Sequence, residues 1–186
     1  MKKNLLNVFL VTAIFFLCTC TAKAQSASGT DMAKAFSNAG LRLLASKVSP
    51  RDFSLSTLAG DTMGLSQFKG KVVFLNFWAT WCGPCRAEMP SMEILYAAYR
   101  EKGLEILAVN SGENRQQVQT FMREYGFSFP ALLDGDRKVS NAYGIQAIPT
   151  SYLIDRDGMI VARLVGSINW DTPEIFAAIE SLLNGL

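Results

Sequence analysis

The chain has 186 residues and no histidine, with 18 lysine and arginine residues against 16 aspartate and glutamate residues. This balance offers no strongly basic surface, so we expect no nucleic-acid partner. The lack of histidine excludes histidine acid–base catalysis, cysteine–histidine nucleophile pairs and most zinc sites. The length suits one compact domain, which we expect to be a monomer.

The N-terminus has the pattern of a secretory signal peptide. Two lysines precede an apolar stretch at residues 5–20, and Ala22 and Ala24 supply the small residues of a cleavage site. The stretch is short for a membrane span. We therefore assign residues 1–24 to a cleaved leader and expect export, to the periplasm or the outer face of the cytoplasmic membrane. An uncleaved anchor and a lipid on Cys20 remain as alternatives.

The next part of the chain is predicted to lead into the main domain. Its elements are a polar linker at 25–30, a helix at 31–47, strands at 53–57 and 62–65, and a short helical turn at 66–70. Pro50 ends the helix, so we assign 25–49 to a linker and an N-terminal helix, and the main domain to 50–186.

The main domain alternates between strands and helices. Two nearly all-apolar strands, at 71–78 and 104–110, have the composition of strands buried on both faces. The other predicted elements are helices at 85–102, 114–125, 137–143 and from Pro173 to near Gly185, and strands at 131–133, 150–155 and 159–165. Pro90 should kink the first of these helices. The order predicts an α/β fold with a mixed central sheet flanked by helices on both faces, after an N-terminal β-hairpin.

The cysteines point to redox chemistry. Removal of the leader takes away Cys18 and Cys20 and leaves Cys82 and Cys85. A pair two residues apart closes too small a loop to add much stability, so reactivity explains it better. A zinc site would need two more ligands, and haem attachment would need histidine where Arg86 stands. We therefore predict a redox disulfide between Cys82 and Cys85, with no metal and no other cofactor.

The position of the pair predicts different roles for the two thiols. Cys82 should lie at the N-terminus of a helix, where free N–H groups and the helix dipole stabilise a thiolate. We expect it to be the exposed nucleophile, with a pKa below the usual value of about 8.5. Cys85, one turn further and less exposed, would be the resolving thiol. Pro84 suits the first helical turn because it has no N–H to lose.

The segment FLNFWATWCGPCRAEMP at 74–90 resembles the active site of the thioredoxin superfamily, and more narrowly that of the exported ResA/TlpA-like thiol–disulfide oxidoreductases. The stretch PRDFSLSTLAGDTMGLSQFKGKVV at 50–73 also resembles this branch, and the likeness covers roughly residues 50–185. The resemblance implies a thioredoxin-like fold and dithiol–disulfide exchange without a cofactor. It also implies protein disulfides as substrates and a membrane protein as the electron donor.

The resemblance implies roles for further residues. Ile148 and Pro149 match the cis-proline turn that faces the cysteines and leaves backbone open for an extended substrate. Trp81, with Gly83 and Pro84 between the cysteines, would belong to the substrate-binding surface. Trp78 matches a second active-site tryptophan, although core packing explains it better.

One departure from typical thioredoxins concerns proton transfer. The buried aspartate expected beneath the cysteines is replaced by Asn76, which cannot exchange protons. Glu88 lies three residues after Cys85 on the same helix face, and we predict that it accepts or relays the proton of Cys85. The alternative is an acid favoured by the helix dipole alone. We expect Arg86 and the turn at 134–136 to be solvated.

The leading functional interpretation is an exported reductase of protein disulfides, for example in cytochrome c maturation. A peroxiredoxin-type thiol peroxidase is the first alternative, but the threonine expected three residues before the reactive cysteine is Ala79 here. The second alternative is a non-enzymatic, disulfide-dependent binding module.

Overall fold

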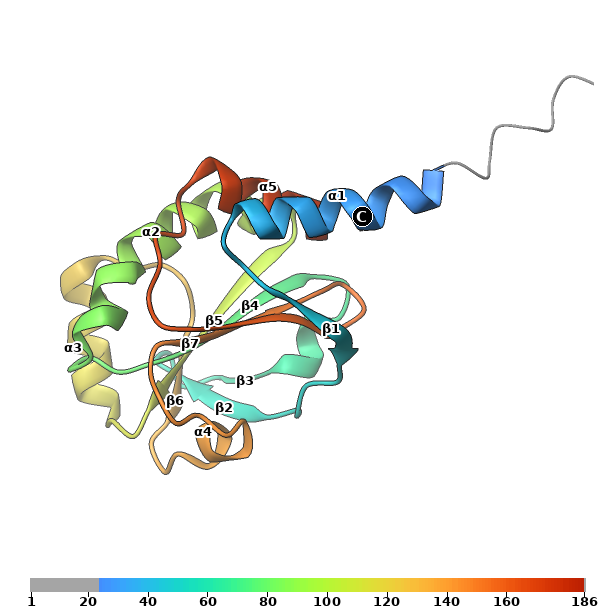
Figure 1. Cartoon of the computed structure of the whole chain (residues 1–186). Coiled ribbons are helices and arrows are strands. Elements are labelled where there is room, and N and C mark those ends of the chain that lie inside the picture. Colours follow the sequence, from blue (N-terminus) through green and yellow to red (C-terminus); the bar gives the residue numbers. More distant parts are fainter. Residues whose placement is uncertain (1–23, 186) are drawn as a thin grey trace, which may run out of the picture.

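A computed structural model describes residues 24–185 of the chain, and side chains from residue 29 onward (Figure 1). The predicted leader, except for its last residue, lies outside the described residues. Within residues 24–185, no helix is both long and apolar enough to cross a membrane.

One mixed sheet of eight strands forms the centre of the molecule, in the order β1-β8-β7-β4-β5-β6-β2-β3. The strands are β1 (Leu43–Val48), β2 (Ser54–Thr57), β3 (Thr62–Gly64), β4 (Val72–Trp78), β5 (Leu104–Ser111), β6 (Ala131–Asp134), β7 (Thr150–Ile154) and β8 (Ile160–Val165). Strands β4, β5 and β6 are parallel, and every other pairing is antiparallel. The predicted mixed sheet is confirmed.

Helices cover both faces of this sheet, as predicted, but unequally. The helices are α1 (Ala24–Asn38), α2 (Gly83–Tyr99), α3 (Arg115–Tyr125), α4 (Lys138–Ala142) and α5 (Pro173–Leu183), with short 3-10 turns at η1 (Leu65–Phe68) and η2 (Arg100–Lys102). Helices α1, α2, α3 and α5 contribute to one hydrophobic core, while η1 and α4 pack with the smaller core on the other face. Figure 1 shows α1, α2 and α5 along the upper side of the sheet and α4 below it.

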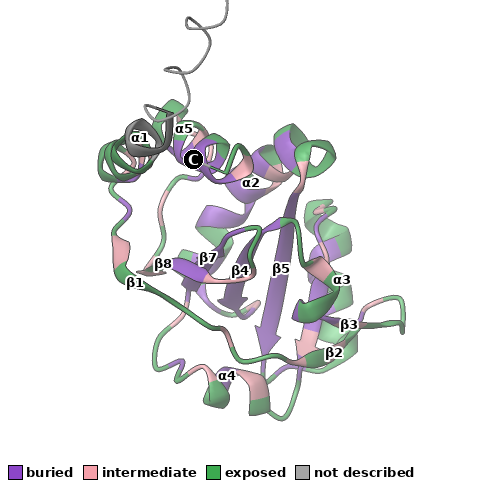
Figure 2. Cartoon of the chain, turned by 90° about the vertical axis from the view of Figure 1, so that its right-hand side faces the viewer, coloured by how far each residue is buried: buried purple, intermediate pink, exposed green. Residues whose placement is uncertain are grey.

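Strand β4 joins the two cores because its side chains alternate between the faces of the sheet. Val72, Phe74 and Trp78 belong to the larger core, and Val73, Leu75 and Phe77 to the smaller one. All seven residues of β4 are buried, as the apolar sequence predicted (Figure 2). The alternation also directs Asn76 towards the face covered by α2, where Glu88 lies.

The N-terminal prediction was wrong in two respects. The expected linker at 25–30 is helical, because it lies inside α1. The helix expected at 31–47 ends at Asn38, and Gly40 then adopts a left-handed conformation that reverses the chain. Residues 43–48 form β1 instead, because they complete the edge of the sheet by pairing with β8. The sheet therefore begins before residue 50, the predicted start of the main domain.

The other predicted elements agree with the structure to within about two residues at most ends, as is usual for helix and strand boundaries. Gly103 and Gly126 lie in left-handed conformations directly after η2 and α3, so both glycines end helical segments as predicted. Pro90 lies inside α2, which continues to Tyr99.

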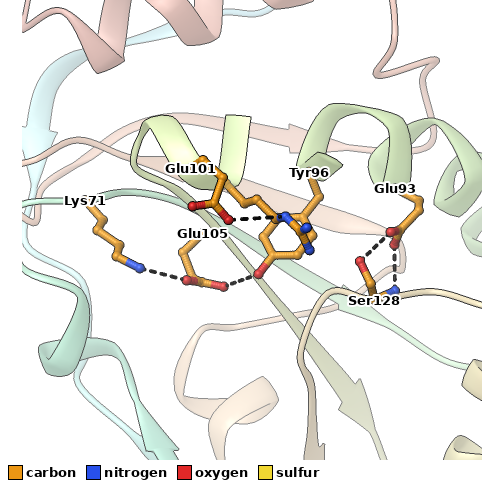
Figure 3. Close-up of polar contacts among 7 residues, drawn as sticks. Lys71, Glu93, Tyr96, Glu101, Glu105 and Ser128 are labelled. Carbon is orange, nitrogen blue, oxygen red and sulfur yellow. Dashed lines mark hydrogen bonds and ion pairs between the residues drawn. The ribbon is translucent and has the colours of Figure 1, made fainter. Parts of the chain in front are cut away.

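A polar cluster ties α2 to the sheet. The Tyr96 hydroxyl donates a hydrogen bond of 2.9 Å to Glu105 on β5, and Lys71 pairs with the other carboxylate oxygen at 3.1 Å. Figure 3 shows Lys71 and Tyr96 approaching Glu105 from opposite sides. Burial, and then the bond to Glu105, raise the pKa of the Tyr96 hydroxyl. Glu93, one turn before Tyr96, accepts a hydrogen bond of 2.8 Å from the backbone N–H of Ser128.

Candidate active site

The loops that follow β4, β5 and β6 meet at one edge of the sheet because the three strands are parallel. These loops carry the cysteines, residues 112–114 and residues 135–137. Strand β7 is antiparallel to β4, so Pro149, directly before β7, comes to the same edge. This edge collects the candidate site from segments far apart in the sequence.

The two cysteines form a disulfide at the N-terminus of α2, with their Cα atoms 5.3 Å apart. Cys82 is the N-cap residue, and the backbone N–H of Cys85 donates to its sulfur at 3.2 Å. Gly83 and Pro84 are exposed in the first turn between them. The predicted location at a helix N-terminus is confirmed.

The expected exposure of Cys82 is only partly right. Cys82 is 4% exposed and Cys85 is fully buried, so the predicted order holds, but the first cysteine is more covered than expected. The carbonyl oxygen of Ile148 lies 3.7 Å from the Cys82 sulfur, so the loop before β7 packs directly against it.

The loop facing the disulfide contains the predicted cis-proline. The peptide bond between Ile148 and Pro149 is cis, and the Pro149 carbonyl accepts a hydrogen bond from Gly166. Trp81 is 70% exposed and lines a groove of about 300 Å³ that Ile148 also lines. Trp78, by contrast, is fully buried against Phe121, which confirms its interpretation as a packing residue.

Glu88 lies on the disulfide helix α2, one turn after Cys85, in a buried polar network. It is 1% exposed and accepts hydrogen bonds from the Asn76 side-chain amide and the Trp170 indole N–H, both at 3.0 Å. Asn76 also donates to Ser151 at 3.0 Å. Burial raises the pKa of Glu88 to about 7, although the hydrogen bonds from Trp170 and Asn76 oppose the shift. A carboxyl with this pKa changes charge near neutral pH, as a proton acceptor must.

Trp170 is a member of this network that sequence reasoning missed. It follows β8 and packs against Phe74 with ring centroids 4.3 Å apart. Its backbone N–H donates to Ser91 on α2 at 2.9 Å. The indole N–H of a buried tryptophan needs a hydrogen-bond acceptor, and this requirement is the one signal for Trp170 in the sequence. The sequence does not identify which acceptor lies nearby.

Glu113 is a second missed residue. It is buried in the loop after β5 and accepts hydrogen bonds from the Thr80 backbone N–H at 2.7 Å, the Thr80 hydroxyl at 2.5 Å and the Asn110 amide at 2.7 Å. Thr80 lies between β4 and the cysteines. Glu113 therefore ties the active-site loop to the neighbouring loop.

The prediction that residues 134–136 and Arg86 are solvated is partly wrong. Asp134 is fully buried and accepts hydrogen bonds from the backbone of Val139 and from the backbone and hydroxyl of Ser140. Its carboxylate organises the start of α4, so it is structural. Arg86 is exposed and bonds to the Tyr125 hydroxyl at 2.7 Å. Within the described part of the chain, no three or more cysteine or acidic side chains gather as metal ligands would.

Comparisons of the sequence with known proteins identify the family of this chain. A sequence profile described as the AhpC/TSA family matches residues 45–163. The chain is 45% identical over 115 residues to thiol-disulfide oxidoreductase ResA of Bacillus thuringiensis (strain Al Hakam). This alignment covers 62% of this chain and 66% of the ResA chain, which is just under two thirds of its length. It is 39% identical over 166 residues to ResA of a Bacillus cereus strain, which covers 89% of this chain and 91% of that protein.

Solved structures give the same grouping. The fold is similar to a putative thiol:disulfide interchange protein DsbE from Chlorobium tepidum, with a TM-score of 0.69 and 34% identity over 75% of this chain and 99% of that one. It is also similar to StoA from Bacillus subtilis, with a TM-score of 0.60 and 28% identity over 69% and 98% of the two chains. The chain therefore belongs to the AhpC/TSA family of thioredoxin-like proteins and, within it, to the ResA-like thiol–disulfide oxidoreductases.

Proposed function

We propose that this protein is exported and reduces protein disulfides by exchange at Cys82 and Cys85, for example in apocytochrome c during cytochrome c maturation. The observation that carries the proposal is the disulfide at the N-terminus of α2, beside the cis-proline loop. Export is supported by the leader pattern at residues 1–24.

The reaction begins from the dithiol form. The thiolate of Cys82 attacks one sulfur of the substrate disulfide, forms a mixed disulfide and expels the other substrate sulfur as a thiolate, which takes a proton from water. Cys85 then loses its proton and attacks the Cys82 sulfur. This step closes the Cys82–Cys85 disulfide and releases the second substrate sulfur as a thiolate, which also takes a proton from water, so the substrate gains two electrons and two protons.

The helix N-terminus supports the first step. The N–H of Cys85 that lies 3.2 Å from the Cys82 sulfur offers a hydrogen bond to a thiolate at the same place. The α2 dipole adds to this stabilisation. We therefore expect the pKa of Cys82 in the dithiol form to lie below the usual value of about 8.5.

The second step needs a proton acceptor for Cys85, and we assign that role to Glu88. Both residues are buried on α2, one turn apart, so water has little access to Cys85. With a pKa of about 7, the Glu88 carboxyl is largely ionised slightly above neutral pH and accepts the proton there.

The loop before β7 supplies a place for extended substrate. In the part of the chain that the structure describes, no hydrogen bond joins the Ile148 backbone to another backbone group. Pro149 has no N–H to compete for it. We propose that substrate backbone pairs with Ile148 while its side chains lie against Trp81, Gly83 and Pro84.

Each turnover oxidises the protein by two electrons, so a dithiol donor must restore Cys82 and Cys85. In an oxidising compartment the family resemblance supports a membrane protein that passes electrons from the cytoplasm. The protein would work as a monomer with this donor and with its substrates in turn.

The deciding measurement is the reduction potential of the protein in a glutathione or dithiothreitol redox buffer. A reductase should have a potential near the thioredoxin value of about −270 mV, whereas strong oxidants lie near −120 mV. Cys82→Ser should abolish reduction of a model protein disulfide, while Cys85→Ser should trap the mixed disulfide. A potential near the oxidant end would overturn the reductase assignment.

The assignment of Glu88 has its own test. In Glu88→Gln, we expect resolution of the mixed disulfide near pH 7 to slow by about tenfold or more, because the proton acceptor is lost. Single-turnover release of substrate thiol measures this step. Glu101→Gln, which removes an exposed carboxylate beyond the end of α2, is the control. Unchanged thiol pKa values and unchanged rates in Glu88→Gln would remove the assignment.

The two alternatives make different predictions. A peroxidase would consume hydrogen peroxide with Cys82 at rates that compete with disulfide exchange. A binding module would keep its partners in both Cys82→Ser and Cys85→Ser. Ala79, where a peroxidase would carry threonine, is fully buried and places no hydroxyl beside Cys82, so disulfide exchange is the better supported function.

A further inference from the structure

The groove beside Trp81 has a distinctive charge. It lies between Trp81, which precedes the nucleophile, and residues 145–148, which end at the cis-proline, and Ser111 and Arg137 complete its lining. The lining contains aromatic, aliphatic and neutral polar side chains, and Arg137 is its single charged residue. Ile148, whose carbonyl oxygen lies 3.7 Å from the Cys82 sulfur, lines this groove together with Arg137, so Arg137 belongs to the surface beside the nucleophile.

The backbone fixes where Arg137 lies. Its φ of 61° and ψ of 20° are left-handed, a conformation that non-glycine residues rarely adopt. Hydrogen bonds from the Arg137 N–H to the Asp134 carbonyl, and from Asn141 to the Arg137 carbonyl, hold this turn. The side-chain stem crosses Gly112, where a Cβ atom would stand 3.2 Å from the Arg137 Cδ. Two loops thus cooperate to place the arginine at the groove.

The charge of Arg137 is not neutralised within the protein. The carboxylate of Asp134 is occupied by backbone and hydroxyl groups of Val139 and Ser140. Asp136 pairs with Lys138 at 2.6 Å. Over residues 29–185, no ion pair or side-chain hydrogen bond involves the Arg137 guanidinium. Its donors are therefore free to bind a carboxylate, for which the planar guanidinium is well suited.

Arg86, the other arginine near the cysteines, differs in this respect. Its guanidinium bonds to the Tyr125 hydroxyl at 2.7 Å and lies over the rings of Phe121 and Tyr125. These contacts occupy it on the α3 side of the active site. Among the residues that line the groove on the cis-proline side, Arg137 is the cation without such a partner.

We propose that Arg137 determines substrate specificity by binding an aspartate or glutamate side chain close to the cysteine that Cys82 attacks. This inference rests on the proposed exchange reaction and adds a substrate class to it: disulfides whose flanking sequence is acidic. An exposed ion pair of this kind raises the rate constant for such substrates by about two- to fivefold.

The test uses reduced protein and disulfide-bridged model peptides. Within each pair, the peptides differ only by Glu or Gln at the second residue from the cysteine, with one pair for each side of it. Second-order rate constants are measured by stopped flow at about 20 mM and 500 mM salt, because salt screens exposed ion pairs. The wild-type protein should prefer the Glu peptide of at least one pair by about two- to fivefold at low salt, and less at high salt.

The variants separate Arg137 from the general charge of the surface. Arg137→Gln should bring the Glu/Gln rate ratio to about one and leave the rate of the Gln peptide unchanged, while Arg137→Lys should keep part of the preference. Arg123→Gln removes an exposed cation on α3, away from the groove, and should keep the wild-type ratio. Equal ratios in wild type and Arg137→Gln, or an equal loss in Arg123→Gln, would overturn the inference. A wild-type protein that reduces none of the peptides would instead overturn the proposed function.

Discussion

Glu88 shows how one buried side chain links stability to chemistry. A carboxyl that is 1% exposed loses the solvation of its charged form, and the two hydrogen bonds from Asn76 and Trp170 recover only part of it. The protein therefore holds Glu88 partly protonated near neutral pH. The cost of that arrangement should be measurable in the folding equilibrium.

We expect Glu88→Gln to change how stability depends on pH. The folded-state pKa of about 7 lies above the unfolded value of 4.5, so the folded protein binds more protons between these values and loses stability as pH rises through them. The wild type should therefore lose up to about 3 kcal/mol relative to Glu88→Gln between pH 4 and pH 8. Urea unfolding of the oxidised protein measures this difference.

The control for this prediction is Glu101→Gln, whose carboxylate is 89% exposed. It should follow the wild-type pH profile. A constant stability difference between wild type and Glu88→Gln across the same pH range would show that Glu88 keeps an ordinary pKa.

Asn76 is suited to both charge states of Glu88. Its Nδ2 donates to the carboxylate, while its Oδ1 is buried without a hydrogen-bond partner among the described residues. A half-turn of the amide would present Oδ1 to Glu88 and accept a hydrogen bond from the protonated carboxyl. The Asn76 amide can therefore hydrogen-bond to Glu88 in both its ionised and its protonated state, whereas an aspartate at this position would repel the ionised Glu88.

Asn76→Asp tests this interpretation. Two buried carboxyls in contact share a proton, so the second ionisation of the pair should move above pH 7. The pH midpoint of mixed-disulfide resolution should rise by about one unit or more. Ser151→Ala removes the other partner of Asn76 without adding charge and should leave the midpoint near the wild-type value. A midpoint in Asn76→Asp that matches the wild type would contradict the proton-acceptor role of Glu88.

At the scale of the secondary-structure elements, the loop between β4 and α2 depends on the loop after β5. The buried Glu113 carboxylate accepts hydrogen bonds from the Thr80 backbone N–H, the Thr80 hydroxyl and the Asn110 amide. A carboxylate can accept all three hydrogen bonds, whereas a glutamine side chain places an N–H₂ group against at least one donor. The two acceptor oxygens of Glu113 therefore stabilise the position of the active-site loop.

Glu113→Gln should lower stability by about 2 kcal/mol, because a buried donor loses its acceptor. It should also slow disulfide exchange several-fold, because Thr80 lies two residues before Cys82. Chemical denaturation and peptide reduction rates measure the two effects. Glu124→Gln, an exposed substitution on the neighbouring helix α3, should change neither. A loss of stability with a fully retained exchange rate would limit Glu113 to a structural role.

At the scale of the molecule, the N-terminal segment stabilises the fold away from the reactive edge. Helix α1 packs against α5, with Phe36 fully buried in the larger core, and β1 completes the sheet beside β8. The cysteines lie at the start of α2, on the edge formed by the ends of β4, β5 and β6.

Phe36→Ala should therefore lower the free energy of unfolding by about 3–5 kcal/mol through loss of burial and formation of a cavity. The exchange rate of the folded protein should stay within about twofold of wild type, because α1 packs chiefly against α5, whereas the disulfide lies at the N-terminus of α2. Ser37→Ala, on the exposed side of α1, is the control for helix content. A parallel loss of exchange rate and stability in Phe36→Ala would show that α1 acts on the active site.

The sequence by itself determined the disulfide helix, the two buried strands and the mixed sheet. Local signals suffice there: an apolar strand is buried on both faces, a cysteine pair at helical spacing shares one turn, and Gly103 and Gly126 end helices because they tolerate a left-handed backbone. Residues 43–48 show the limit of such signals. Their pattern fits a helix, but the open edge of β8 offers backbone hydrogen bonds that only the folded sheet provides.

Only the tertiary structure decided which side chains surround the cysteines. Trp170 contacts Glu88 across 82 residues of sequence, Glu113 reaches Thr80 across 33, and Arg137 lines the groove beside Trp81. The positions of Glu113 and Arg137 depend on parallel strands that end at a common edge, and the position of Trp170 depends on the antiparallel pairing of β8 with β7. Such pairing leaves no mark in local sequence spacing. The reactive pair and the position of Glu88 one helical turn away are local properties of the chain, while the partners of Glu88, the support of the active-site loop and the charge beside Trp81 depend on the fold.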